Sequence, residues 1–386
     1  MTLHATLSPR EEIITRQVAA MRSAGLDANI SCSPEGFAHL TGFVVPSQPL
    51  IRHRHAMAIL SAAGDMSLFG VDMEESTIRR QAPAQHLTVW AEFRDDPMAV
   101  LADRLTTLGL GSARIGIELD YLPAADFARL VRLMPAARFE PIDAMLARLR
   151  QIKTPAEIAL LRELSRIADR AIADAYAAVG PGSSEMDIAA ALTRRVYELG
   201  AEHFKLLIVA TGERSQLPNV GPTARILQKG DICRVEIFAV KAGYQAGVCR
   251  TAYVVEPPPM AEKIWSLLAD CKQRILDQVR PGASCLAIYQ DFIGRLATMN
   301  LPPISFVAHG IGLHLHEDPY IGETPTIGRP GQDTLLEEGM VLGFEPLCYR
   351  TGFGYGMQNK DLLCVTASGA ELLSNHTNTD RLIRVG

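Results

Sequence analysis

Three segments in the second half of the sequence concentrate residue types that can carry acid–base chemistry. Residues 227–251 contain LQKGDICRVE and GYQAGVCRT, residues 309–319 read HGIGLHLHEDP, and residues 338–361 contain EGMVLGFEP and MQNKD. Histidine titrates near neutral pH and glutamate can activate water, so both suit general acid–base catalysis when a fold brings them together. These segments are candidates for a single active site.

In their order and spacing the three segments resemble the catalytic domain of the pita-bread family, which includes methionine aminopeptidase, prolidase, aminopeptidase P and creatinase. The pattern HGxGxxxHExP, at 309–319, is specific. Residues 21–28, 40–43 and 152–154 look like those of the two-domain branch, so the resemblance covers almost the whole chain. It implies a creatinase-like α/β domain followed by an α+β pita-bread domain with a curved antiparallel sheet.

The metallopeptidases of that family hold two divalent ions with two aspartates, a histidine and two glutamates. The matching positions in this sequence are Glu236, Gly247, His309, Glu345 and Lys360. Gly247 has no side chain and Lys360 is a cation, so both bridging carboxylates are missing. Two ions about 3.5–4 Å apart need such bridges to offset their repulsion. We therefore expect no metal and no cofactor, which places the chain closest to the metal-free, creatinase-like branch.

Lys360 is expected to supply the charge that the ions supply in the relatives. Two carboxylates facing one pocket, Glu236 and Glu345, need a counter-charge, because an unpaired buried charge is costly. In the alternative, Lys360 points to solvent, since a register inferred by resemblance can slip. Glu236 is either the partner of Lys360 or a site for a cationic part of the substrate.

Two histidines are the candidates for proton transfer and substrate contact. Within the motif, His309 is expected to act as general acid or base, with Glu345 orienting it or activating water. His316 looks like the substrate-facing histidine of the family. These roles follow from the resemblance.

The sequence departs from creatinase at two positions. Asn219 stands where creatinase-like and prolidase-like chains carry a histidine, and Cys249 stands where creatinase carries a glutamate. We expect Asn219 to contact the substrate. A thiol facing His309 and a cation would have a lowered pKa and could be a nucleophile. Alternatively, Cys249 lines the pocket or is a small buried apolar residue.

Arg52 and Arg54 lie in the segment RHRH, before a predicted strand. In creatinase-like dimers the equivalent region reaches the pocket of the neighbouring subunit and helps to bind the substrate carboxylate, a task that suits an arginine fork. An exposed basic loop is the alternative, and the sequence does not decide which arginine points inward.

The elements that must position these residues follow from hydrophobic periodicity. In residues 1–150 helices at 10–25, 97–108 and 124–133 alternate with strands at 26–33, 56–61, 67–71 and 114–118, a pattern typical of an α/β domain. Residues 151–386 form the second domain. They open with a capping box at Thr154 and Glu157, followed by helices at 155–179 and 184–200, strands at 206–210, 232–240 and 245–255, helices at 259–279 and 285–299, and a strand-rich tail.

The composition excludes several classes of protein. Hydrophobic residues make up 48% and charged residues 21% of the 386, as in globular proteins, and the length favours two domains. A net charge of −5 argues against nucleic-acid and membrane partners, which need a clustered basic face. Seven cysteines without CxxC spacing form neither a disulfide framework nor a zinc site. With no signal peptide and no apolar run long enough to span a membrane, a cytoplasmic protein is expected.

Together these observations predict a homodimeric hydrolase that cleaves a C–N bond of a small polar non-peptide compound by acid–base catalysis without metal. An amidine, guanidino, ureido or cyclic amide compound fits this description, and the sequence does not choose among them. Two alternatives remain open: an Xaa-Pro dipeptidase or aminopeptidase with an atypical single metal ion, and an inactive pita-bread binding protein.

Overall fold

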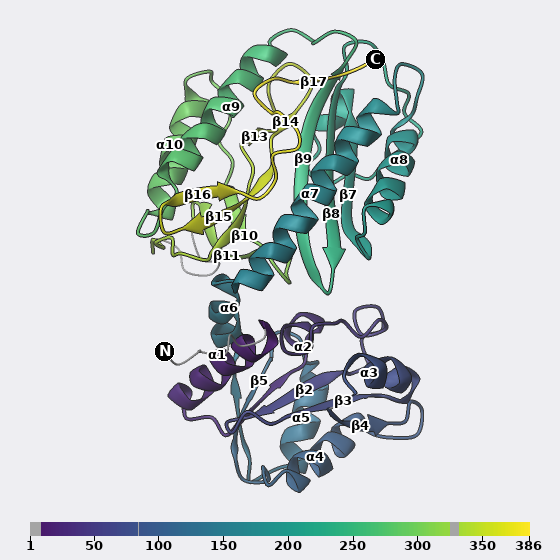
Figure 1. Ribbon diagram of the computed structural model, residues 1–386, viewed down its shortest axis with the longest axis vertical. Coiled ribbons are helices and arrows are strands. Elements are labelled where there is room, and N and C mark those ends of the chain that lie inside the picture. The colour runs from purple at the N-terminus through teal and green to yellow at the C-terminus, as the bar shows by residue number, and fades with distance from the viewer. Residues whose placement is uncertain (1–8, 84, 325–331) are drawn as a thin grey trace, which may run out of the picture. The chain divides into compact units, whose positions relative to one another are not determined.

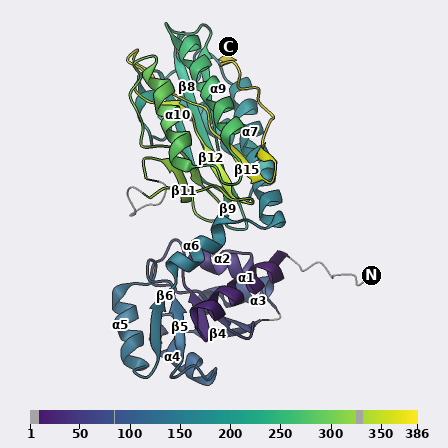
Figure 2. The same ribbon diagram turned by 90° about the vertical axis from the view of Figure 1, so that its left-hand side faces the viewer.

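The computed structural model describes residues 9–83, 85–324 and 332–386. The chain divides into two compact units, Met1–Arg150 and Gln151–Gly386, which are drawn in Figures 1 and 2. The first residues of the sequence, on which the expectation of no signal peptide partly rests, lie outside the described part. Every helix within the described ranges is too short or too polar to cross a membrane.

The first unit is a six-stranded mixed sheet with helices on both faces. The strand order is β4-β3-β2-β1-β5-β6, in which β1–β2 and β2–β3 are antiparallel pairs and the other pairs are parallel. The strands are β1 (Ala28–Ser31), β2 (Met57–Ser61), β3 (Met66–Val71), β4 (His86–Trp90), β5 (Arg114–Ile117) and β6 (Arg138–Pro141). The helices are α1 (Pro9–Ala24), α2 (Pro34–Thr41), the 3₁₀ turn η1 (Asp72–Glu74), α3 (Glu75–Gln81), α4 (Pro97–Thr107), α5 (Ala124–Leu133) and α6 (Asp143–Gln151).

Alternate residues of the central strands face two separate hydrophobic cores. On β2, Met57 and Ile59 pack into the core that α4 and α5 cover. Ala58 and Leu60 point the other way, into the core that includes residues of α1 and α2. This period of two is what a strand with both faces buried requires.

The second unit contains two larger sheets and a small hairpin. A four-stranded sheet has the order β17-β9-β8-β7, a five-stranded sheet has the order β11-β10-β12-β15-β16, and β13 pairs with β14. The strands are β7 (His203–Thr211), β8 (Ile232–Lys241), β9 (Tyr244–Val254), β10 (Phe306–Gly310), β11 (Glu317–Gly322), β12 (Val341–Phe344), β13 (Leu347–Cys348), β14 (Met357–Gln358), β15 (Asp361–Thr366), β16 (Gly369–Leu372) and β17 (Ile383–Val385).

Two helix pairs cover these sheets from outside (Figure 1). The helices are α7 (Pro155–Ala177), α8 (Glu185–Glu198), the 3₁₀ turn η2 (Gly212–Gln216), α9 (Ala261–Gln278) and α10 (Cys285–Ala297). Helices α7 and α8 pack on the four-stranded sheet, and α9 and α10 pack on the five-stranded sheet. A bridge between Cys249 and Lys360 joins the two sheets at the centre of the unit. Glu236 of β8, His309 of β10 and Glu345, which directly follows β12, converge around Lys360.

The predicted fold class is confirmed. The capping box at Thr154 and Glu157 is present, and the predicted strand 232–240 is β8, one residue longer. The short helix α2 was not predicted. It begins after Ser33, whose hydroxyl accepts a hydrogen bond from the backbone N–H of Gly36, and eight residues are too few for a clear helical period.

Candidate active site

A pocket of about 560 Å³ opens in the second unit where the two sheets meet. Its lining includes Glu236 from β8, Glu345 directly after β12, and Lys360 directly before β15. His316 and Asn219 also line it. Segments from distant parts of the sequence therefore bring five of the predicted site residues around one cavity.

The ammonium group of Lys360 lies at the centre of this cluster. Its Nζ atom is 3.0 Å from Oε1 of Glu236 and 3.4 Å from Oε2 of Glu345. The third neighbour is Nε2 of His309, at 3.3 Å. Burial alone would lower the pKa of Lys360, but the charges of Glu236 and Glu345 raise it above its ordinary value. Lys360 is therefore a fixed cation at neutral pH, and it does not point to solvent.

Glu345 is a carboxylate held in two directions. Its Oε2 atom accepts a hydrogen bond from Nε2 of Gln358 at 2.5 Å, beside the contact with Lys360. Burial raises the pKa of Glu345 to about 6, against the opposing attraction of Lys360. A carboxyl group with a pKa near 6 can accept and return a proton near neutral pH, as a general base requires.

His309 and His316 are neutral at neutral pH. Nδ1–H of His309 donates to the carbonyl oxygen of Gly310 at 2.8 Å, which leaves the Nε2 lone pair facing Lys360. Burial, followed by the charge of Lys360, holds the pKa of His309 well below its usual range. The same two causes lower the pKa of His316 to about 4. The predicted proton transfer by His309 stays a prediction, and the pKa of Glu345 lies closer to neutral pH than that of either histidine.

The two imidazoles form one rigid unit. Their rings stack with centroids 3.7 Å apart and planes 7° from parallel. Nδ1 of His316 lies 3.1 Å from the hydroxyl of Tyr320, and the ring of Phe306 packs edge-on against both histidines. His316 is thus held in place on the pocket wall, ready to offer its other ring nitrogen to a ligand.

The site does not fit the pair of metal ions that the resemblance implies. Lys360 Nζ contacts the three side chains that would remain as metal ligands, Glu236, His309 and Glu345. The ammonium group therefore occupies the space between them that a metal ion would need. A side chain at residue 247 is excluded too, because a Cβ added to Gly247 would lie 2.3 Å from the ring of Phe238. Across the described ranges, no three His, Cys, Asp or Glu side chains are arranged to hold a metal ion.

Cys249 lies at the junction of the two sheets, paired with Lys360. Its backbone pairs with Lys360 across the sheet junction, its side chain is fully buried, and the described pocket lining does not include it. Burial raises the pKa of the thiol well above its ordinary value, and Glu236 adds to the effect. The roles of nucleophile and pocket lining stay predictions for Cys249, and its burial favours the alternative of a small buried apolar residue.

Arg52 and Arg54 belong to the first unit, where both have local partners. Arg54 forms a two-pronged ion pair with Glu92, with both N–O distances 2.9 Å. Arg52 donates to the carbonyl oxygen of Tyr121 and lies over its ring. Their contact with the pocket of a neighbouring subunit stays a prediction.

Phe238, Gln358 and Tyr349 are among the residues of the site that were not predicted. Phe238 and Gln358 are each two positions from a predicted residue, Glu236 and Lys360, and residues two apart on a strand share a face. That spacing is a signal that could have identified them. The ring of Phe238 lies 4.7 Å from Lys360 Nζ, and Tyr349 lines the pocket from the loop after Glu345.

Comparisons with known proteins agree with this architecture. Residues 159–367 match the metallopeptidase family M24, and residues 14–152 match the creatinase/prolidase N-terminal domain. The chain is 27% identical over 373 residues to the probable dipeptidase PepE of Mycobacterium tuberculosis, covering 94% of this chain and 95% of that protein. It is 29% identical over 248 residues to the Xaa-Pro dipeptidase of Pyrococcus furiosus, covering 63% of this chain and 68% of that protein.

A solved structure extends the similarity to three dimensions. The crystal structure of dipeptidase PepE from Mycobacterium ulcerans superimposes with a TM-score of 0.80 at 26% identity, covering 97% of this chain and 98% of that one.

These relatives correct the predicted function. They are named as dipeptidases, so the prediction of a hydrolase for a non-peptide compound is wrong. The predicted hydrolase class and the resemblance to the creatinase, aminopeptidase P and prolidase family are confirmed, whereas the metal-free branch stays a prediction. Residues 159–367 make up more than half of the chain, and on that match the chain belongs to the metallopeptidase family M24.

Proposed function

We propose that the chain hydrolyses the peptide bond of short peptides, Xaa-Pro dipeptides among them, without a bound metal ion. The observation that carries the proposal is the contact between Lys360 Nζ and Glu345 Oε2 in the wall of one pocket. A fixed cation and a carboxylate whose pKa is about 6 are thereby available to the same ligand. The dipeptidase names of the relatives support the choice of a peptide substrate.

The chemistry needs two groups. Glu345 takes a proton from water, and the water oxygen forms a bond to the carbonyl carbon of the peptide. The ammonium of Lys360 donates a hydrogen bond to the oxygen on which negative charge develops, as a preorganised donor does in an oxyanion hole. Glu345 then returns its proton to the leaving nitrogen as the C–N bond breaks. The two products are a free carboxylate and a free amine.

Other side chains hold these two groups in position. Gln358 fixes one oxygen of Glu345, and Glu236 shares the charge of Lys360. His316 and Asn219 line the pocket and are the candidates for contact with the ligand.

One observation favours a second function. Two carboxylates already form ion pairs with the ammonium of Lys360. Their negative charge weakens the stabilisation that Lys360 can give to a developing oxyanion. A peptide-binding protein without turnover would have the same pocket. The two functions differ in one measurable respect, which is the release of products.

The test is hydrolysis of a panel of Xaa-Pro and other dipeptides by the purified chain, followed by mass spectrometry with and without a strong chelator. We expect turnover that the chelator does not change and that Glu345→Gln removes. Turnover that needs added metal contradicts the proposal. Binding of dipeptides with no turnover in the native chain supports the second function instead.

A homodimer, with the first unit of one subunit near the pocket of the other, and residence in the cytoplasm complete the proposal. Light scattering of the purified chain tests the dimer, and a monomeric mass contradicts it. Fluorescence microscopy of the tagged full chain in cells tests the location.

A further inference from the structure

A second cavity, of about 850 Å³, adjoins the active-site pocket. Both cavities are lined by Pro218, Ile304 and Tyr349, so they share a wall within the second unit. We call the larger one the outer chamber. Lys360 and Glu345 line the active-site pocket and are absent from the described lining of the outer chamber.

The surface of the outer chamber is mainly apolar. Its lining includes Leu217, Pro302, Pro303 and Leu347 in addition to the shared residues. Leu217 is a large hydrophobic side chain that remains 47% exposed. Apolar side chains of a ligand would gain about 25 cal/mol for each Å² of such surface that they remove from water.

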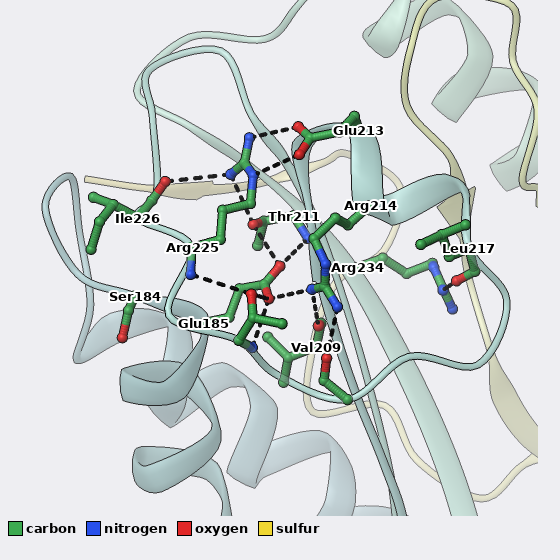
Figure 3. A network of polar contacts seen from close by, with 12 residues as sticks. Ser184, Glu185, Val209, Thr211, Glu213, Arg214, Leu217, Arg225, Ile226 and Arg234 are labelled. Atoms are coloured by element: carbon green, nitrogen blue, oxygen red, sulfur yellow. Dashed lines mark hydrogen bonds and ion pairs between the residues drawn. The ribbon is translucent and has the colours of Figure 1, made fainter.

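Two of the charged residues in the chamber already have partners (Figure 3). The carboxylate of Glu213 accepts hydrogen bonds from Arg225 at 2.9 and 3.2 Å. Arg214 forms an ion pair with the buried carboxylate of Glu185. These charges belong to the network that fixes the loop, and they are not available to a ligand.

Arg350 is different. It lines the outer chamber from the loop after β13 and is exposed. Within the described ranges, its guanidinium takes part in no hydrogen bond and no ion pair. An unpaired guanidinium beside an apolar surface is suited to a carboxylate, which it can bind with two parallel hydrogen bonds.

The wall between the cavities is rigid. The buried side chain of Arg234 donates to the carbonyl oxygens of Ser215, Leu217 and Pro218, and it lies 5.0 Å from the ring centroid of Tyr349. Arg234 also donates to Gln358, whose amide holds Glu345. One side chain thus supports both the outer chamber and the catalytic carboxylate, and a preformed site loses little entropy on binding.

We propose that the outer chamber binds the C-terminal part of peptides longer than two residues, with apolar side chains on its surface and the terminal carboxylate on Arg350. The inference rests on the proposed function and specifies its substrate class. The chain would then prefer short oligopeptides with an apolar C-terminal half over dipeptides.

Calorimetric binding to the native full chain tests this inference. The probes are Ala-Pro, Ala-Pro-Leu-Leu and the C-terminal amide of Ala-Pro-Leu-Leu, each with its first peptide bond reduced so that no turnover occurs. We expect the tetrapeptide acid to bind at least about tenfold more tightly than the dipeptide, which is about 1.4 kcal/mol. The amide should lose most of this gain.

Arg350→Gln should weaken the tetrapeptide acid to the level of its amide and leave the dipeptide unchanged. The matched control is Arg381→Gln, since Arg381 is also exposed but lies outside the lining of either cavity. Melting temperatures show whether both variants fold. If the dipeptide binds but the tetrapeptide acid gains nothing, or Arg350→Gln changes nothing, the inference is overturned and the proposed function stands. If no peptide binds at all, both are overturned.

Discussion

Lys360 Nζ lies 3.0 Å from Glu236 Oε1, and both side chains are almost completely buried. The pair places a positive charge among residues at positions that, by the family resemblance, match metal ligands of metallopeptidases. The ammonium also contacts His309 and Glu345, so it takes up the remaining ligands as well. This arrangement has consequences for stability, for pH dependence and for metal binding.

Lys360→Met should destabilise the chain by about 3–5 kcal/mol at pH 8, because two buried carboxylates lose their counter-charge. The loss should be smaller at pH 5, because burial raises the pKa of Glu345 to about 6 and a protonated Glu345 needs no counter-charge. Urea unfolding followed by circular dichroism measures both values.

Adding Glu236→Gln to Lys360→Met should recover part of the stability. The control is Lys229→Met, because Lys229 forms an exposed ion pair that contributes at most about 1 kcal/mol. Equal effects of the two lysine variants would contradict the buried pair.

Peptide hydrolysis should depend on the ionisation of Glu345. Its pKa is raised to about 6, so the base is protonated below that pH and kcat/KM should fall as the pH drops through 6 and level off above it. Glu345→Gln should lower kcat by about 10²–10⁴ while peptide binding persists. A pH profile without a step near 6 in the native chain argues against Glu345 as the base.

Gly247→Ala should cost about 1–3 kcal/mol, as over-packing in a dense core does. The new Cβ would lie 2.3 Å from the ring of Phe238, which lies under Lys360. The smaller side chain in Phe238→Leu should relieve the strain, so the double variant should be more stable than the two single effects predict. Thermal unfolding of the four proteins tests this. Additive effects would show that the ring is not the obstacle.

A second buried ion network supports the same sheet junction. Arg250 bridges Asp169 at 2.9 Å and Asp361 at 2.5 Å, so Arg250→Met should cost about 3–5 kcal/mol. The control is Arg194→Met, because Arg194 forms an exposed ion pair with Glu198. This variant should change the free energy of unfolding by less than about 1 kcal/mol. Denaturant titration at pH 7 compares the two.

The same network predicts the response to acid. Burial would raise the pKa of Asp169, but Arg250 and the hydrogen bonds from Ser374 and Thr377 together lower it. A lowered pKa in the folded state stabilises the fold above the unfolded value of about 3.9, and this contribution is lost as the pH falls through the folded value. In Arg250→Met, the free energy of unfolding should therefore fall less steeply as the pH is lowered. The same steepness in the variant and the native chain would show that Arg250 does not lower the pKa of Asp169.

Much of the fold could be predicted from local signals. The proline and capping box at Thr154 fix the start of α7, and hydrophobic runs locate strands such as β8 to within one residue. The family resemblance of the three segments implied that Glu236, Glu345 and Lys360 meet, and the structure brings them together.

The properties of the site were harder to predict. The stack of His309 on His316, the burial that shifts their pKa values and the burial of Cys249 beside Lys360 depend on packing across strands. No local pattern encodes these contacts. The substrate class was also wrong, because missing metal ligands change the chemistry without indicating which bond is cleaved.

We propose that the ammonium of Lys360 takes the place of metal in the active site. Calorimetric titration of the chelator-treated chain with Mn²⁺, beside the same titration of Lys360→Glu, tests it most directly. We expect no binding by the native chain and measurable binding by the variant, in which a carboxylate joins Glu236, His309 and Glu345. Stoichiometric binding of Mn²⁺ by the native chain, abolished by His309→Ala, would contradict the account.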